Sequence, residues 1–523
     1  MRVSLQELNA RVVTHGLLAC ALIIGATPLA PAQFVTRTGS RLFVDGHPFY
    51  FVGTNAYYLL EEAARGDTGT VKALFNTANA LGLSVVRTWA FFDSSDSLNP
   101  AVIQFRPGAY NESALRALDY VVLQAKLHNV RLLFPLVNSW DDYGGMNQYV
   151  EWRIGVGPPD AQPEKYSTEK LQERIAGPRG QSYRVALSEY FGHDDFYGDE
   201  IIKDWFKDYI SMIVHRQNTH TGVLYRDEPA ILGWELANEP RSSDRSTALI
   251  TAWAAELSSF IKSLDPNHLV GTGEEGFDNT TARYTTRVYN NQWWLFDGSA
   301  GLSFTANSTL SSIDFASIHL YPESWNLPGS SGNAWIQDHT SIASTVQKPL
   351  IMGEFGIRTQ RAPTYDSWLT TALWEEAAGA VVWQVLEGTR TDAEGFGFRC
   401  GGEDPPCVTL RNNAARFALK SQTGTLNPPS VFSLQQNYPN PFNVLTSISY
   451  TLPYDAHVVL EVFNITGQRV AAIVERFQRA GTRKELLDGG TLASGAFFYS
   501  LVVSDRADGS RRHVETKKMI LMK

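Results

Sequence analysis

The sequence predicts an α/β fold, namely a (β/α)8 TIM barrel followed by a small C-terminal all-β sandwich. The chain of 523 residues is long enough for one large barrel and an appendage of about a hundred residues. Between residues 34 and about 419, short apolar runs alternate with amphipathic helical stretches, as repeated βα units around a parallel sheet do. Beyond residue 430, short strand-like runs are separated by Gly and Asp turns, which is typical of a sandwich.

Eight runs are expected to form the barrel strands. They are Phe49 to Tyr57, Ser84 to Phe91, Arg131 to Asn138, Ile231 to Ala237, Leu269 to Glu274, Phe315 to Tyr321, Leu350 to Phe355 and Ala380 to Leu386. The intervening helical patterns include Glu112 to His128, Ile201 to Arg216 and Ala248 to Leu264, with apolar residues three or four apart. Such barrels place their active sites on the loops at the C-terminal ends of the strands.

Four segments are expected along the chain. Residues 1–32 are predicted to be an export signal, since Arg2 and Arg11 precede an apolar run and Ala30-Pro31-Ala32 offers a cleavage site. A lipoprotein signal at Cys20 is the alternative, although the apolar run continues past it. The barrel domain would span 33–420, a linker 421–430 and the sandwich 431–523. The protein should therefore be secreted or on the cell surface after signal cleavage.

Composition excludes some classes of protein. The net charge is -9 and no basic stripe with interleaved aromatics occurs, so no nucleic acid is expected as a partner. Once the signal is removed, Cys400 and Cys407 remain as a disulfide candidate, with two free thiols as the alternative. No His lies between them to complete a zinc site, and no metal is expected.

Two glutamates end predicted strands at the catalytic rim of the barrel. Glu239 ends the fourth strand in Trp234 to Pro240, and Glu354 ends the seventh in Met352 to Gly356. Glycoside hydrolysis requires one carboxyl group to protonate the leaving oxygen and a second to attack or assist at the anomeric carbon. Either glutamate alone would more often be a solvated residue or a structural ion pair. Two of them at strand ends favour catalysis.

Other strand ends offer supporting groups. Arg87 could hold a nucleophile ionised, or could form a salt bridge at the rim. His319 and Tyr321 lie two apart on one strand and share a face, although a lone strand His is usually a core residue. Trp383 could stack on a sugar ring or be buried in the barrel.

These motifs resemble glycoside hydrolase family 5, and within it the endo-β-1,4-mannanases of plants, fungi and some bacteria. The resemblance covers about residues 34 to 390. It rests on Phe51 to Tyr58, Val86 to Phe91, Leu136 to Asp141, Tyr143 to Gly145, Gln148 to Val150 and Trp234 to Arg241.

The resemblance implies a role for each site residue. Glu239 would be the proton donor and Glu354 the nucleophile. Asn238 would contact the sugar 2-hydroxyl and His319 would lie near the acid/base. The other expected substrate-site residues are Arg87 and Tyr321 beside the nucleophile, Trp89 and Trp383 at the cleavage subsite, and Asn138, which stands where relatives outside the mannanase branch have His.

The expected function is therefore retaining, internal hydrolysis of β-1,4-mannosidic bonds in mannan, galactomannan or glucomannan, without a cofactor and in a monomer. The alternatives are a family 5 β-1,4-glucanase and a non-catalytic mannan-binding surface protein. Tyr183 to Tyr197 and Asn290 to Ser308 depart from the mannanase pattern, which leaves the distal subsites open. Since Glu239 must first act as an acid, we expect it to retain its proton more readily than Glu354.

The C-terminal module resembles the sorting domains of type IX secretion cargo. The resemblance rests on Asn437 to Asn443, Leu460 to Val470 and Ser494 to Tyr499. It implies that outer-membrane secretion machinery is the partner of this module. A carbohydrate-binding sandwich is the alternative, but the module contains no Trp.

Overall fold

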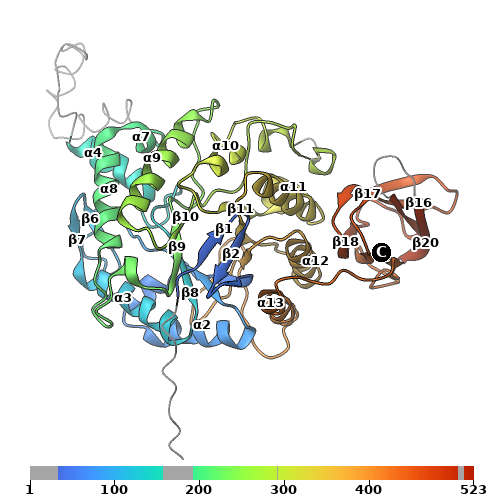
Figure 1. The fold of residues 1–523 in the computed structure, drawn as a ribbon, viewed down its shortest axis with the longest axis horizontal. Helices are drawn as coiled ribbons and strands as arrows, with labels where there is room; N and C mark the ends of the chain where they lie inside the picture. Colours follow the sequence, from blue (N-terminus) through green and yellow to red (C-terminus); the bar gives the residue numbers. More distant parts are fainter. Residues whose placement is uncertain (1–32, 157–191, 285, 291, 505–511) are drawn as a thin grey trace, which may run out of the picture. The chain divides into compact units, whose positions relative to one another are not determined.

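The computed structural model describes residues 33–156, 192–504 apart from 285 and 291, and 512–523 (Figure 1). The expected export signal lies outside these residues. So do residues 157–191, which include most of the Tyr183 to Tyr197 stretch. Among the described helices, none is both long and apolar enough to cross a membrane.

The eight predicted strands form one parallel sheet, which confirms the barrel. Their bounds are β4 Phe51–Asn55, β5 Val85–Arg87, β8 Arg131–Pro135, β9 Ile231–Glu235, β10 Leu269–Gly271, β11 Ala316–Leu320, β12 Leu350–Phe355 and β13 Gly379–Val382. The order is β10-β9-β8-β5-β4-β13-β12-β11, so the first and eighth strands pair. A parallel bridge between Gly271 and Phe315 joins the two ends of this order. A side chain at Gly271 would collide with the Phe315 ring, so the closure depends on glycine there.

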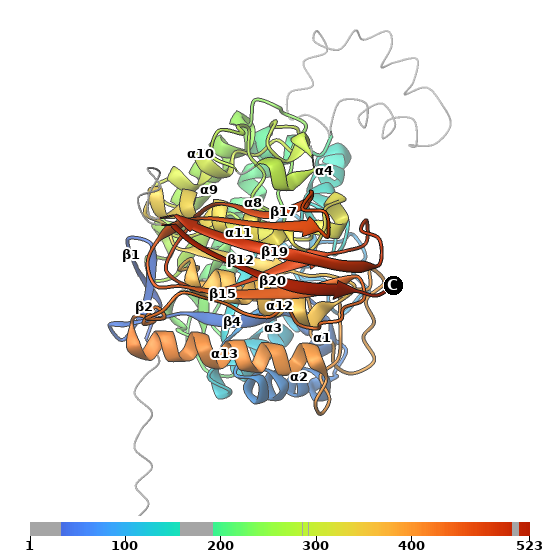
Figure 2. The same ribbon diagram turned by 90° about the vertical axis from the view of Figure 1, so that its right-hand side faces the viewer.

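Helices surround the sheet, as Figures 1 and 2 show. The main ones are α2 Thr68–Leu81, α3 Glu112–Leu127, α8 Glu200–Val214, α9 Ala248–Leu264, α11 Ser331–Thr345, α12 Arg361–Trp374 and α13 Pro405–Thr423. Local sequence sets their starts: Asp67, Asn111 and Asp199 accept hydrogen bonds from backbone N–H groups in the first turns of α2, α3 and α8. The last helix, α13, packs against α12 and α2 (Figure 2).

The barrel interior is apolar toward the N-terminal ends of the strands and polar above. The apolar layer contains one large residue from each strand, or from the position just before β11: Phe51, Val85, Leu133, Leu232, Leu269, Phe315, Ile351 and Val381. Two positions further along their strands, β5 and β11 place Arg87 and Ser317, which are also buried. Because side chains two apart share a face of a strand, these polar groups extend the interior toward the C-terminal rim.

Short elements that the sequence did not reveal precede or interrupt the βα units. The strands β1 Thr36–Thr38, β2 Arg41–Val44 and β3 His47–Pro48 form an antiparallel sheet before the barrel, and β6 Gln104–Arg106 pairs with β7 Ala109–Tyr110. The short helices are α1 Leu59–Ala64, α4 Gly145–Val156, α7 Asp195–Gly198 and α10 Phe304–Thr309. Apart from α4, these elements are runs of two to six residues, which are too short for a periodic pattern to predict them.

The C-terminal module consists of two antiparallel sheets, as predicted. One has the order β14-β15-β18 and the other β17-β16-β19-β20. The strands are β14 Ser433–Leu434, β15 Leu445–Leu452, β16 Ala456–Asn464, β17 Arg469–Gln478, β18 Gly481–Asp488, β19 Gly495–Ser504 and β20 Arg512–Leu521. In β17 and β18, charged residues interrupt the apolar positions. Every second residue of β15 and β16 is buried, and these side chains form much of the core between the sheets.

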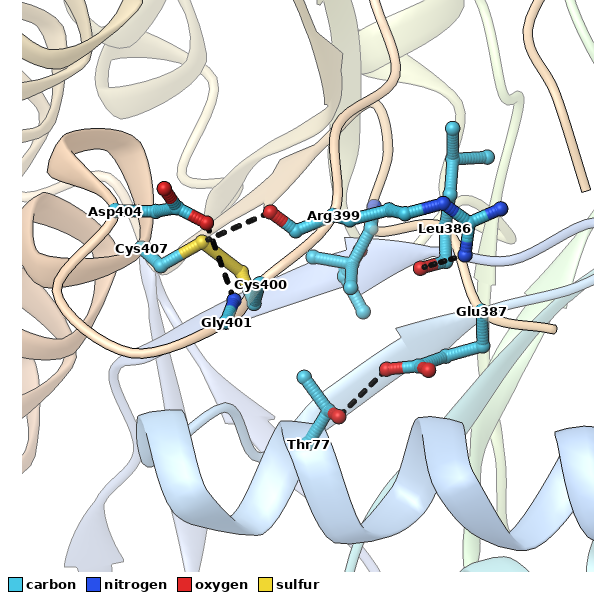
Figure 3. Close-up of a disulfide and its surroundings, with 10 residues drawn as sticks. Thr77, Leu386, Glu387, Arg399, Cys400, Gly401, Asp404 and Cys407 are labelled. Atoms are coloured by element: carbon cyan, nitrogen blue, oxygen red, sulfur yellow. Dashed lines mark hydrogen bonds between the residues drawn. A yellow bond between two sulfur atoms is a disulfide. The ribbon is translucent and has the colours of Figure 1, made fainter.

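A disulfide joins Cys400 and Cys407 (Figure 3). It links the segment that follows β13 to the first turn of α13. In the same segment, Arg399 donates a hydrogen bond to the carbonyl of Leu386, and the Gly401 N–H donates to Asp404 (Figure 3). The disulfide therefore fixes the segment that connects the last strand of the barrel to its last helix.

Candidate active site

Glu239 follows β9 in a turn whose backbone is unusual. Its φ is 48°, in the left-handed region that few non-glycine residues adopt. The Glu239 N–H donates to the carbonyl of Gly273, at 2.9 Å, beyond the end of β10. A Cβ at Gly273 would lie 1.9 Å from the carbonyl oxygen of Ala237, so only glycine permits this approach of the two strand ends. The turn thus fixes the direction of the Glu239 carboxylate.

Glu354 lies on β12, buried at the same rim. Its Oε1 accepts a hydrogen bond from Arg87 Nη1 at 2.5 Å, and its Oε2 accepts one from the Tyr321 hydroxyl at 2.5 Å. Both partners were expected beside this carboxylate. Two donors, one of them a cation, favour the ionised form and fix which oxygen lone pairs remain available.

The two carboxyl groups lie close together, with His319 between them. One oxygen of Glu239, one oxygen of Glu354 and a ring nitrogen of His319 all lie within 4.8 Å of one another. His319 Nδ1 is 2.7 Å from Glu239 Oε1 and 3.8 Å from Glu354 Oε2. Carboxyl groups at about 5 to 5.5 Å are typical of retaining glycosidases, whereas inverting enzymes leave about 6.5 to 9.5 Å for a water.

Arg87 lies at the centre of a buried polar network. It donates from Nε to Glu235 at 2.7 Å, from Nη1 to Glu354 and to Asn55, and from Nη2 to Asn238 at 2.8 Å. Asn238 in turn donates to the side-chain oxygen of Asn138 at 3.0 Å, so the network extends to the third strand. The network brings together Arg87, Asn238 and Asn138, which the sequence placed at this site.

The predicted aromatic residues lie in one cluster. Trp383 is stacked on Tyr57, with ring centroids 5.5 Å apart and planes 8° from parallel. Trp89 contacts both Tyr57, at 5.1 Å, and Tyr143, at 5.0 Å. The Tyr143 hydroxyl donates to Glu61, which also pairs with Arg390. The rings therefore pack against one another, and Tyr143 is also held by a hydrogen bond.

A groove of about 740 Å³ adjoins Glu239 through Trp140. Trp140 is among its lining residues and donates from Nε1 to Glu239 Oε2 at 2.7 Å. Arg241 lies over the Trp140 ring, with its guanidinium carbon 5.0 Å from the ring centroid, and forms two hydrogen bonds to Glu275. Trp294, from the Asn290 to Ser308 insertion, also lines the groove.

The directions of the pKa shifts reverse the order expected from the sequence. Burial alone would raise the pKa of Glu239, but the hydrogen bond and charge of His319, together with Arg241 and Trp140, lower it. Burial raises the pKa of Glu354, and the charges of His319 and Arg87 offset this only in part. Burial would lower the pKa of His319, but the charges of Glu354 and Glu239 raise it. In the absence of substrate, these shifts favour the anion of Glu239 and the protonated form of His319.

Several residues of the site escaped sequence reasoning. Trp140 and Arg241 were noted only as parts of motifs, because nothing local shows that an indole reaches Glu239 or that a guanidinium packs on that indole. Glu235 was not singled out either. It follows Trp234 within a buried strand, where a charged residue is rarely found without a partner, and that signal could have identified it.

Two carboxyl groups this close at the C-terminal rim of a barrel match the arrangement in retaining glycoside hydrolases. Residues 32–398 match the model of the family described as GH family 5 beta-mannosidase-like, and the chain belongs to that family. Residues 436–520 match the secretion system C-terminal sorting domain.

Individual relatives agree with this family. The chain is 36% identical over 397 residues to mannan endo-1,4-beta-mannosidase 2 of Oryza sativa, a match covering 71% of this chain and 82% of the relative. Among solved structures, it resembles an endo-1,4-beta-mannanase from Rhizomucor miehei at 36% identity and a TM-score of 0.61, over 74% of this chain and all of that one. An endo-beta-1,4-mannanase from Thermotoga petrophila matches at 26% identity and a TM-score of 0.61, over 91% of this chain and 98% of that one.

Proposed function

We propose that this protein is a retaining endo-β-1,4-mannanase that hydrolyses internal bonds of mannan, galactomannan or glucomannan. The observation that carries the proposal is the placement of Glu239 and Glu354 with oxygens within 4.8 Å of each other. The relatives named as mannan endo-1,4-beta-mannosidases support the substrate class.

In the first step, Glu354 attacks the anomeric carbon and the glycosidic C–O bond breaks. Glu239 transfers its proton to the departing oxygen, and a mannosyl ester forms on Glu354. Arg87 and Tyr321 orient the attacking carboxylate by their hydrogen bonds. His319, 2.7 Å from Glu239, is the nearby store of the proton that Glu239 donates.

In the second step, a water attacks the ester and Glu239 accepts one of its protons. The anomeric configuration is retained because two displacements occur in sequence. Trp140 stabilises the carboxylate form of Glu239 through its indole N–H, which prepares Glu239 for this second, basic role.

The groove beside Glu239 supports internal cleavage. Since Glu239 protonates the leaving group, the groove lined by Trp140 and Trp294 would receive the part of the polysaccharide that departs. A groove that holds the departing part of the chain favours cleavage away from a chain end. The indole of Trp140, 43% exposed, suits the apolar face of a sugar ring.

The substrate class can be tested by measuring reducing-sugar release and product sizes from mannan, galactomannan, glucomannan, xylan and carboxymethylcellulose. We expect rapid loss of viscosity and mixed oligosaccharides from the mannans. Higher activity on the cellulose derivative than on every mannan would favour the β-1,4-glucanase alternative. Binding of mannan without hydrolysis would favour the non-catalytic alternative.

The pH profile of kcat/KM is expected to be bell-shaped. Glu354 should set its acid limb, and Glu239 together with His319 should set its basic limb. Glu354 must be ionised to attack, and its pKa is raised above the ordinary 4.5, so activity should fall on the acid side at a pH above that value. The proton shared by Glu239 and His319 is lost as pH rises through the raised pKa of His319, above 6.5. Measuring kcat/KM from about pH 3 to about pH 10 tests both limbs. An acid limb below pH 4 would contradict the raised pKa of Glu354.

We propose that residues 1–32 are a cleaved signal and that residues 431–523 direct export across an outer membrane. The match of residues 436–520 to a sorting domain supports the second part. Immunoblots of host fractions would compare the full chain with a variant ending near Thr425. The full chain should leave the cell or remain on its surface, and the shortened chain should remain in the periplasm. Equal export of both would contradict the sorting role.

A further inference from the structure

Glu235 is a buried carboxylate that no step described above uses. It ends β9, its side chain is 0% exposed, and its Oε2 accepts the Nε–H of Arg87 at 2.7 Å. Its other oxygen faces the Ser317 hydroxyl at 3.4 Å. Because Glu235 is buried beneath the rim, it acts on the reaction only through Arg87.

Arg87 therefore has two anionic partners, one on each side. Glu235 and Glu354 are both within 2.7 Å of its guanidinium, while Asn55 and Asn238 are neutral acceptors. The arginine itself is 0% exposed. Removing one partner of a buried pair strongly disfavours the charge that remains, since water cannot replace that partner.

The proposed reaction removes one of these partners in every cycle. When Glu354 attacks the anomeric carbon, its carboxylate becomes a neutral ester and Arg87 loses that anion. The charge returns when water cleaves the ester. Arg87 must stay protonated and ordered throughout, because no other described cation contacts Glu354 at hydrogen-bond distance.

We propose that Glu235 is the permanent counter-ion of Arg87 and thereby balances the two chemical steps. This inference rests on the proposed role of Glu354 as nucleophile. With Glu235 charged, Arg87 is neutralised in both states of Glu354. Arg87 then stabilises the anion of Glu354 less, so Glu354 is more nucleophilic in the first step. Conversion of its carboxylate to a neutral ester also leaves Arg87 with a counter-ion. Glu235 is a positioning residue in this sense and never touches the substrate.

The test is Glu235→Gln, which keeps the shape and an acceptor oxygen for Arg87 but removes the charge. Arg87 then has Glu354 as its sole anionic contact and holds it more tightly. Glycosylation, measured as kcat/KM on dinitrophenyl β-mannobioside, should slow by about tenfold or more. Hydrolysis of the ester trapped by 2-deoxy-2-fluoro-mannobiosyl fluoride should become faster, because Glu354 is a better leaving group. The acid limb of kcat/KM should move about one pH unit lower.

Four titratable groups face Glu354, namely Arg87, Tyr321, His319 and Glu239, and none of them is changed in this variant. The opposite signs of the two rate changes distinguish the proposal from a structural role, which would slow both steps and leave the acid limb unmoved. Slowing of both steps with an unmoved acid limb, or rate constants equal to those of the wild type, would overturn the proposal.

Glu228→Gln is the matched control. Glu228 is also fully buried and forms an ion pair, 2.8 Å from Lys126, before the opposite end of β9. It should lose stability without any change in the ratio of the two rates. If Glu235→Gln does not fold, Glu235→Asp can be used, because its shorter side chain withdraws the carboxylate from Arg87. Glycosylation should again slow and hydrolysis of the ester should again become faster, each by a smaller factor. Unchanged rates would overturn the proposal.

Mass spectrometry of the trapped protein separates this inference from the proposed function. A label on a residue other than Glu354 would refute the nucleophile assignment. A label on Glu354 combined with an unaltered ratio of rates in the variant would refute the role of Glu235 alone.

Discussion

Glu354→Ala is expected to lower kcat on mannan by roughly 10⁴-fold or more while leaving the fold intact. Without this carboxylate no mannosyl ester can form, and Arg87 and Tyr321 lose the group that they orient. Azide should restore turnover on an activated aryl mannoside, because it can occupy the vacated space and attack the anomeric carbon directly. The product should be the inverted, α-configured azide, which NMR identifies.

Glu387→Ala serves as the control for this variant. Glu387 follows β13 at the rim and accepts a hydrogen bond from Thr77, outside the catalytic cluster. It should retain near wild-type kcat. Wild-type activity of Glu354→Ala, or rescue by azide with a retained product, would refute the nucleophile assignment.

The activity that Glu239→Ala loses should depend on how much the leaving group of the substrate needs a proton. Mannan needs proton donation and should be hydrolysed about 10² to 10⁴ times more slowly, the range typical of general acid catalysis. The dinitrophenolate of dinitrophenyl β-mannobioside leaves without being protonated, so kcat/KM on this substrate should change little. Its ester would then accumulate, because the base for the second step is missing, and azide should release it as the retained β-azide.

Kinetics on the two substrates, with pre-steady-state measurement of dinitrophenol release, provide the check. A burst followed by slow turnover is expected for the activated substrate. Equal losses on mannan and on the dinitrophenyl substrate, with no burst, would contradict the acid/base role of Glu239.

The barrel and most of its catalytic rim could be predicted from sequence because one rule links them. Apolar strands alternating with helices imply a barrel, and polar residues that end those strands must then converge. Glu239, Glu354 and Arg87 follow from that rule. Contacts between loops do not follow from it. Trp140 reaches Glu239 across 99 positions of sequence, and no periodic pattern indicates that distance.

The pKa of Glu239 is shifted down and that of Glu354 up, opposite to the order expected from the sequence, for a related reason. The sequence predicted which groups would act as acid and nucleophile but not how many hydrogen-bond donors each would receive. Glu239 accepts hydrogen bonds from His319 and Trp140, and these favour its anion before substrate arrives. The number and charge of these donors depend on side-chain geometry, which a sequence pattern does not show.

The pairing of β4 with β13 has a consequence for folding. The first and last strands of the barrel are neighbours in space, with Phe51 beside Gly379 and Thr54 beside Val382. Until β13 has been synthesised, one edge of β4 has no partner, and an open strand edge can pair with other chains. Closure of so long a loop is also slow compared with local helix formation. Fragments that end before residue 379 should therefore aggregate rather than form a smaller enzyme, and hydrolytic activity should arise only once the final βα unit is complete.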